Sequence, residues 1–175
     1  MNRRQNVHEL ISSVYPLLGN DGLMSPEHLT ERIILSPCNE DVHKINVEAL
    51  GNLLGEAYTY LAADKMIRDE HGRDSRFTTE FINNLNPPGS PPFKLDIKVG
   101  CTVMLLINLA PKEGLCNGTR LVVTRCGRYV IEAKIIIGEK AGDIVFIPRI
   151  TFQPSPSELD IQMERRQIPY VLHMR

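Results

Sequence analysis

The feature that most constrains the fold of this chain is a run of residues near its middle, 94–123. Apolar and charged residues alternate over 94–99, which is typical of a strand with one solvated face. After Gly100, residues 103–106 are continuously apolar, as in a strand that is covered on both faces. Asn117-Gly118 is a dipeptide that favours a tight hairpin turn. The run therefore predicts the first strands of a small antiparallel β-barrel.

Strand signals continue beyond this run at short and regular spacing. Further strands are expected at 119–124, 129–136 and 144–147, and a last one at 168–172. Many short strands at even spacing, separated by turn dipeptides, favour an SH3-like or OB-like barrel.

The first half of the chain has helical periodicity instead. Apolar residues at helical spacing predict one helix over 7–14 and a second one from 42 to 53. The second helix follows an apolar run, Arg32–Leu35, that predicts a strand, and Tyr58–Ala62 predicts another strand. Because a strand that feeds directly into a helix is the half-unit of an α/β sheet, this half is expected to be α/β.

A stiff connector marks the predicted boundary between the two halves. Residues 64–76 are charged and predict a loop, and Glu80–Leu85 predicts one or two helical turns. Asn86–Pro92 is rich in proline, which excludes a helix or a central strand there. The sequence therefore predicts an α+β fold in three parts: an α/β segment over 1–86, the small barrel over 93–150, and a return segment over 151–175.

Composition is that of a globular domain, with 42% hydrophobic and 23% charged residues and a net charge of −1. The charge is unevenly distributed, because residues 1–76 carry 8 basic and 12 acidic side chains, whereas residues 93–153 carry 9 and 5. A basic half beside an acidic half is compatible with nucleic acid that touches one face only. An ordinary segregation of surface charge explains it equally well. No run approaches 18 apolar residues and no signal peptide is recognisable, so we expect no membrane partner.

The motif search finds no catalytic centre. The sequence contains no phosphate-binding G-x-x-x-x-G-K-[ST] loop, no G-x-S-x-G elbow and no H-E-x-x-H helix. Asp69-Glu-His-Gly72 superficially resembles an acidic helicase box, but it follows no apolar strand and favours a solvated loop. The four cysteines have no C-x-x-C spacing, so free thiols are expected and no metal site is predicted.

The remaining candidates are suited to binding nucleic acid. Ser36 and Asn39 stand where a helix is predicted to begin, and a helix N-terminus favours a phosphate; simple capping of the helix is the alternative. Six basic residues are expected on strands or turns of the barrel, with Phe93 and Tyr129 nearby. They are Lys94, Lys98, Arg120, Arg125, Arg128 and Arg149. Together they predict a groove for single-stranded nucleic acid that combines phosphate pairing with base stacking, although few aromatic residues are available.

Several of these segments resemble those of the PIF and helitron DNA helicases, and they follow one another in the order found in that family. The matching segments are Ile33–Asn46, Tyr60–Asp64, Phe81–Leu106, Leu115–Val123, Val145–Arg149 and Arg165–Pro169. The resemblance implies part of the second RecA-like domain, called 2A, with an inserted SH3-like barrel called 2B. Thr102 stands where the family usually has proline and Ile107 where it usually has arginine.

The resemblance also implies a function and its cofactors. PIF-type helicases move 5′ to 3′ along single-stranded DNA and use ATP and Mg²⁺, in an N-terminal domain that this chain lacks. We therefore expect a fragment or truncated paralogue that binds single-stranded DNA weakly and without sequence preference, holds no cofactor and is not an ATPase alone. The missing helicase domain would be its partner. The resemblance also implies an intracellular protein that resides in the nucleus.

Two other interpretations remain open at the level of sequence. The first is a barrel that binds proteins, derived from a decayed transposon helicase and without affinity for nucleic acid. The second is a gene product whose boundaries were wrongly assigned, so that the ATPase half is encoded in adjoining DNA.

Overall fold

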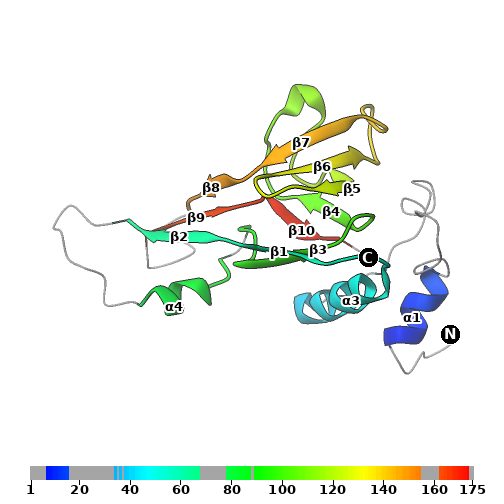
Figure 1. The fold of residues 1–175 in the computed structure, drawn as a ribbon, viewed down its shortest axis with the longest axis horizontal. Coiled ribbons are helices and arrows are strands. Elements are labelled where there is room, and N and C mark those ends of the chain that lie inside the picture. Colours follow the sequence, from blue (N-terminus) through cyan, green and yellow to red (C-terminus); the bar gives the residue numbers. More distant parts are fainter. Residues whose placement is uncertain are drawn as a thin grey trace.

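The computed structural model describes residues 7–15, 34, 36, 38–67, 78–87, 89–154 and 162–173. They form three antiparallel sheets with helices on one side and at one end (Figure 1). The largest sheet has the strand order β10 (Tyr170–Leu172), β4 (Thr102–Leu105), β5 (Arg120–Cys126), β6 (Val130–Ile135) and β7 (Ile144–Pro148). The second sheet orders β2 (Ala63–Met66), β9 (Met163–Gln167) and β8 (Ile150–Phe152), and the third pairs β1 (Tyr58–Leu61) with β3 (Lys94–Ile97).

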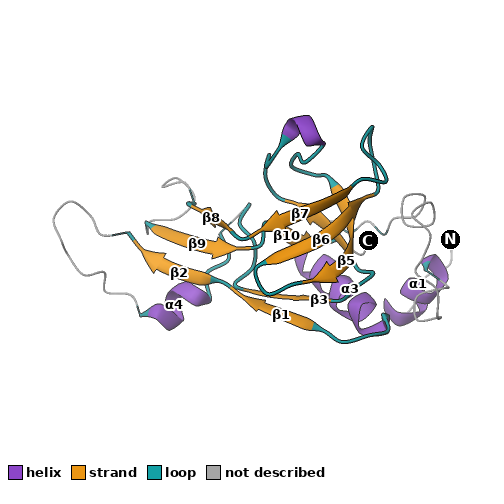
Figure 2. Ribbon diagram, turned by 45° about the horizontal axis from the view of Figure 1, so that its top comes forward, coloured by secondary structure: helices purple, strands orange, loops and turns teal. Residues whose placement is uncertain are grey.

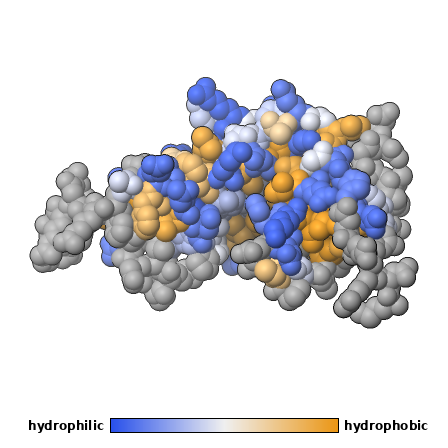
Figure 3. Space-filling model, turned by 90° about the horizontal axis from the view of Figure 1, so that it is seen from below, coloured by the Kyte–Doolittle hydropathy of each residue, from blue (hydrophilic) through white to orange (hydrophobic). Residues whose placement is uncertain are grey.

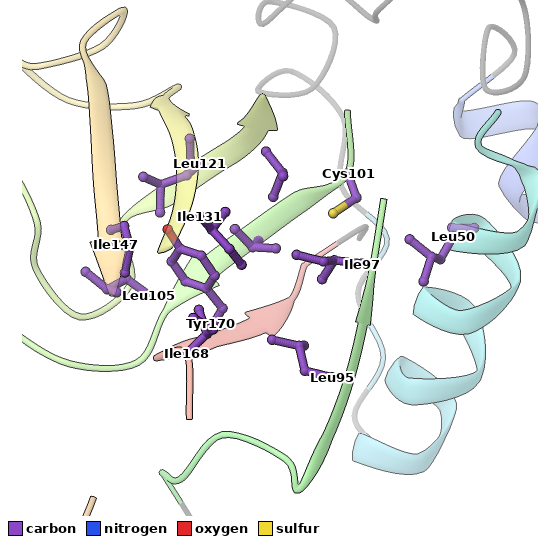
Figure 4. Close-up of a cluster of buried hydrophobic side chains, with 14 of the residues drawn as sticks. Leu50, Leu95, Ile97, Cys101, Leu105, Leu121, Ile131, Ile147, Ile168 and Tyr170 are labelled. Carbon is purple, nitrogen blue, oxygen red and sulfur yellow. The ribbon is translucent and has the colours of Figure 1, made fainter. Parts of the chain in front are cut away.

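The five-stranded sheet encloses the main apolar core on its inner face (Figure 4). Leu121 on β5 lies opposite Ile135 on β6, and Ile131 on β6 lies opposite Ile147 on β7. All four are almost completely buried, as is Tyr170 on β10. Alternate residues point to opposite faces of a strand, so this register sends the apolar set to one side.

The sheets are joined by strands that bend and run from one sheet into the next. β1 continues into β2 through Ala62, β7 into β8 through Arg149, and β9 into β10 through residues 168–169. In each case one segment pairs within one sheet and the following segment pairs within another. The chain therefore passes from one sheet to another at three places, and these continuous strands fix how the sheets lie relative to each other.

Helices α1 (Val7–Val14) and α3 (Asn39–Asn52) lie at one end of the molecule (Figure 1). They pack on each other, and Ile11 and Ala49 are completely buried in the core cluster. The α3 helix is fastened to the sheets because the Asn46 side-chain amide donates a 2.8 Å hydrogen bond to the carbonyl of Leu172. The shorter helices are α4 (Thr79–Asn83) and the 3-10 turn η1 (Pro111–Glu113).

Most of the predicted elements are confirmed. The helix over 7–14, the helix that ends near 53, the strand at 58–62, the turns after Glu80 and the strands of the central run are all present. The α+β fold class is confirmed as well. Closure of the five-stranded sheet into an SH3-like barrel and the division at 86–93 stay predictions, although β1 and β3 pair across that connector.

The prediction of a loop over 64–76 was wrong at its start, because β2 covers Ala63–Met66. Strands β8 and β9 were not predicted at all. β9 has the sequence Met-Glu-Arg-Arg-Gln, which carries no apolar alternation, so its pairing is imposed by its neighbours. The strand predicted at 32–35 and residues 68–76 lie outside the described residues, apart from Ile34, which is buried.

A buried ion pair explains how so polar a strand lies inside the protein. Arg165 on β9 and Asp64 on β2 have completely buried side chains, with 2.7 Å between Nη2 and Oδ2 and 2.9 Å between Nε and Oδ1. Arg165 also donates to the carbonyl of Pro91 at 3.2 Å and lies over the ring of Phe93. Since a planar guanidinium matches a carboxylate through two parallel bonds, β9 and β2 are locked in register here.

Removing Asp64 should destabilise the protein strongly. The Asp64→Ala variant leaves the Arg165 guanidinium buried without its partner, which typically costs about 3–5 kcal/mol. Asp96→Ala is the matched control, because Asp96 also pairs with a basic residue on a strand, Lys94 at 2.9 Å, but both side chains are more than a third exposed. Surface pairs contribute about 0.2–1 kcal/mol. Urea denaturation measures both variants, and equal losses would contradict the role given to the buried pair.

The four cysteines should differ sharply in reactivity. All are free thiols; Cys38 is exposed, whereas Cys101 is completely buried. Burial raises the pKa of the Cys101 thiol to about 12, so its reactive thiolate is almost absent at neutral pH. A thiol reagent at pH 8 should modify Cys38 in the native protein and reach Cys101 only after unfolding. A Cys38→Ser variant should lose the fast phase, and modification of Cys101 at the rate of Cys38 would contradict the described core.

Candidate nucleic-acid interface

A cleft with a basic lining lies where the five-stranded sheet meets the three-stranded sheet. Its volume is about 520 Å³. At this junction β8 begins next to the end of β7 (Figure 2). Its walls come from the turn between β5 and β6, the end of β7 and the middle of β9: Arg128, Tyr129, Val130, Pro148, Arg149 and Arg166.

The turn that carries Arg128 and Tyr129 is fixed by the residue before it. The amide of Gly127 donates to the carbonyl of Val130 at 3.1 Å, which closes the turn. A Cβ atom at position 127 would lie 2.7 Å from that carbonyl oxygen, so any residue other than glycine would force the turn open. The Tyr60 hydroxyl also donates to the Gly127 carbonyl at 2.9 Å. The two side chains at the tip are therefore presented from a rigid base.

Arg149 stands at the bend between β7 and β8 and is held from the opposite side. Its Nη1 donates a 2.6 Å hydrogen bond to the carbonyl of Leu61, and its guanidinium lies 5.8 Å from the centre of the Tyr60 ring. Both contacts are with β1, so Arg149 ties the bend of one strand to the bend of another. A guanidinium has five N–H donors, and the hydrogen bond to Leu61 uses only part of them. The same group also lines the cleft.

The electrostatic character of the cleft follows from its lining. Three of the six lining residues are arginines and none is acidic. The guanidinium of Arg128 lies 5.3 Å from the centre of the ring of Tyr129, a cation–π arrangement. Guanidinium groups bind phosphate through paired donors, and an exposed aromatic ring can stack on a base. Chemically, the cleft is suited to a phosphate-bearing ligand with flat rings.

The predicted binding residues separate into groups in the structure. Arg128 and Arg149 come together in the cleft, beside the predicted stacking residue Tyr129. Arg125 is exposed on β5 opposite Glu132 and does not line the cleft. Arg120 is partly buried on β5 in the neighbourhood of Tyr15; burial lowers its pKa from the usual value, and the tyrosine opposes the shift.

The two lysines are engaged elsewhere. Lys94 pairs with Asp96 on the same strand, and the Lys98 amino group donates to the carbonyl of Leu53 at 2.7 Å. Both therefore take part in local contacts at the β1–β3 side of the molecule. Their role in binding nucleic acid stays a prediction.

The site predicted at the start of the second helix contains one local hydrogen bond. Cys38 occupies the N-cap position of α3, and the Ser36 hydroxyl accepts a 3.3 Å hydrogen bond from the Cys38 amide. Asn39 is the first residue of the helix, and its side chain lies outside the described residues. The N-cap residue makes no side-chain capping bond, and the contact of Ser36 lies before the helix; capping and phosphate binding there both stay predictions.

Sequence reasoning missed Arg166. The residue lies on β9, a strand that no periodicity predicted, with its side chain exposed while the neighbouring Arg165 is buried. Two consecutive residues of a strand point to opposite faces. Had this strand been predicted, one of the two arginines would have been assigned to the interior and the other to the surface. Among the described residues, no cluster of acidic, histidine and cysteine side chains could hold a metal ion, and no helix is long and apolar enough to cross a membrane.

Comparison with known proteins identifies the architecture. Residues 80–126 match the sequence family described as the 2B domain of the DNA helicase Pif1. Unliganded Pif1 from Bacteroides has 23% sequence identity and a TM-score of 0.54 over 78% of this chain. Bacteroides Pif1 bound to single-stranded DNA has 21% identity and a TM-score of 0.57 over 95% of this chain. Pif1 from Candida albicans has 17% identity and a TM-score of 0.56 over 95% of it.

The fold is therefore similar to that of part of the Pif1 helicases, and the match to the 2B domain lies within this part. This likeness agrees with the resemblance seen in the sequence, and the chain is similar to only part of each solved helicase. It spans 38%, 34% and 43% of the length of the three solved chains. None of the curated proteins matched the sequence.

Arg149 should contribute to stability as well as to the cleft. Arg149→Ala removes the hydrogen bond to the Leu61 carbonyl and the contact with the Tyr60 ring, and a loss of about 1–2 kcal/mol is expected. Arg128→Ala is the control, because Arg128 is exposed, and changes at such surface sites typically stay within about 0.5 kcal/mol. Chemical denaturation distinguishes them. A stability of Arg149→Ala equal to that of the parent protein would show that the bend does not depend on this contact.

Proposed function

We propose that this chain supplies a binding surface for single-stranded DNA within a PIF-family helicase, and that the cleft between the sheets holds the phosphate backbone. The observation that carries the proposal is the convergence of Arg128, Arg149 and Arg166 around an exposed tyrosine, with no acidic residue in the lining. Each arginine comes from a different part of the chain, so the positive charge is concentrated by the fold and is not a local sequence run.

The chemistry of the cleft supports binding that is independent of base sequence. Contacts between arginine and phosphate position a strand but carry no information about its bases. The groups are also held in place before the ligand arrives, since Gly127 fixes one wall and the Leu61 carbonyl fixes Arg149. The similarity to a Bacteroides Pif1 that was solved with single-stranded DNA supports the same ligand class.

The use of ATP and Mg²⁺ is assigned to the rest of such a helicase. The 175 residues contain no phosphate-binding loop of the G-x-x-x-x-G-K-[ST] type. Phosphoryl transfer needs that loop and its metal ligands, with arginine contacts from a second domain. We therefore propose that the chain binds DNA without hydrolysing ATP, and that hydrolysis requires a partner domain.

The proposal is tested by measuring binding to a fluorescent oligo-dT at several salt concentrations. The logarithm of the affinity should fall linearly with the logarithm of salt, with a slope of about −0.7 for each phosphate neutralised. The double variant Arg128→Ala/Arg166→Ala removes two of the three cleft charges, so the slope should become shallower by about 1.4. The loss should be the same for oligonucleotides of different sequence.

The matched control removes two other exposed basic residues, in Lys112→Ala/Lys140→Ala. Both line a different cleft beside η1, so the change in net charge is identical but the position is not. If the control weakens binding as much as the cleft variant, the DNA responds to overall charge and not to the cleft. Binding that ignores salt, or no binding by the parent protein, would contradict the proposal.

A second candidate function, a protein-binding module, has one observation in its favour. An apolar groove of about 410 Å³ lies between α3, β3 and β10, and Val47, Leu50 and Leu95 are in its wall. Hydrophobic side chains reach the surface among hydrophilic ones on the face that is seen from below, where α3 and β1 lie (Figure 3). An absence of DNA binding would favour this function.

A further inference from the structure

Strand β7 has an apolar sequence but an uncovered outer face. It reads Ile144-Val-Phe-Ile-Pro148, an apolar run of the kind usually covered on both sides. Its inner residue Ile147 is completely buried, yet Ile144 is 58% exposed and Phe146 is 65% exposed. Ile144 and Phe146 lie on the same exposed face of the strand as Pro148, and a contiguous exposed apolar patch often marks a binding site. β7 is also the last strand in its sheet, next to β6 alone.

This face continues directly into the arginine cleft. On the outer side, Val130 pairs with Pro148, and both line the cleft. Phe146 lies two residues along β7 from Pro148, so it points to the same face at a distance of about 7 Å. Tyr129, at the mouth of the cleft, is 66% exposed. The two most exposed aromatic rings among the described residues therefore lie on either side of the Val130–Pro148 pair.

The charges around Phe146 are mixed but favour an anionic ligand. Glu132 lies directly across from Phe146, and its carboxylate accepts a 2.8 Å hydrogen bond from the Thr124 hydroxyl. Arg125 is paired in register with Glu132, and Lys134 follows it on the same face. Arg128, Arg149 and Arg166 at the adjoining cleft add three further basic groups.

We propose that Phe146 and Tyr129 form a platform on which the bases of a single strand stack while its phosphates lie along the arginine cleft. This inference rests on the proposed function and adds the part of the ligand that the arginines cannot hold. Base–aromatic stacking tolerates any base because every base has a π-face, so the platform keeps binding independent of sequence. It also gives the bare face of β7 an occupant whose charge matches the neighbouring cleft.

The test separates stacking from charge. Stacking is worth about 1–3 kcal/mol per base, so Phe146→Ala should weaken oligo-dT binding by about 5- to 150-fold. The reduction should be equal at every salt concentration and should leave the salt slope unchanged, because no ionic contact is removed. Phe146→Leu keeps an apolar side chain without a ring and should lose most of the same affinity. Oligonucleotides with 2-aminopurine should show quenched fluorescence with the parent protein and much less with either variant.

Two controls keep the result interpretable. Phe81→Ala removes another exposed phenylalanine, 43% exposed on α4 and far from β7 (Figure 1), and it should bind like the parent protein. Circular dichroism and the urea midpoint of each variant confirm that its fold is retained, as expected for a side chain that is mostly in solvent.

The outcomes of the two proposals are distinguishable. If the parent protein does not bind DNA at all, the proposed function fails and the platform fails with it. If the parent binds with the expected salt slope but Phe146→Ala binds equally well, only the platform is overturned. If the Phe146 variants leave DNA binding intact and instead convert a dimer to a monomer in sedimentation, the face of β7 pairs two copies of the chain, which also overturns the platform.

Discussion

The buried pairing of Arg165 with Asp64 is the interaction on which the arrangement of the sheets depends. After Met163, strand β9 carries only polar and charged residues, which would not enter an apolar interior by themselves. Its guanidinium is neutralised by a carboxylate from β2, and its Gln167 side-chain amide donates to the backbone carbonyl of Tyr60. These bonds satisfy groups whose burial would otherwise be unfavourable. They also reach the proline-rich connector through the Pro91 carbonyl, so a segment without secondary structure is fixed by side chains of a strand.

The same strands that carry these bonds also create the cleft. Because β1–β2, β7–β8 and β9–β10 each bend as they pass from one sheet to another, residues distant in sequence meet at the junction. Arg149 occupies one bend and is bonded to the Leu61 carbonyl beside another. Arg166 is presented outward by the strand that turns Arg165 inward. The position of the basic side chains is thus set by the way in which the sheets are joined.

Periodicity predicted the elements whose own sequence decides their structure, and it missed those decided by partners. The central run, the helix over 7–14 and the turn at Asn117-Gly118 carry clear local signals, and each is present. β2, β8 and β9 are short or polar strands that exist because neighbouring chain segments pair with them. Arg128 and Arg149 were found as candidates because basic residues in a predicted barrel are conspicuous. Arg166 was missed because its exposure follows from a strand that was not predicted, and the burial of Arg120 depends on packing near Tyr15 from outside the five-stranded sheet.

Arg149 has a consequence for how related sequences should be interpreted. The same side chain stabilises the bend through the Leu61 carbonyl and lines the cleft, whereas Arg128 lines it and contacts the ring of its sequence neighbour Tyr129. In a lineage that no longer needs the ligand, selection for a folded chain would still preserve the first residue and would let the second drift. The presence of an arginine at 149 in a descendant is therefore poor evidence that the proposed binding is retained, and the residues at 128 and 166 are the informative positions.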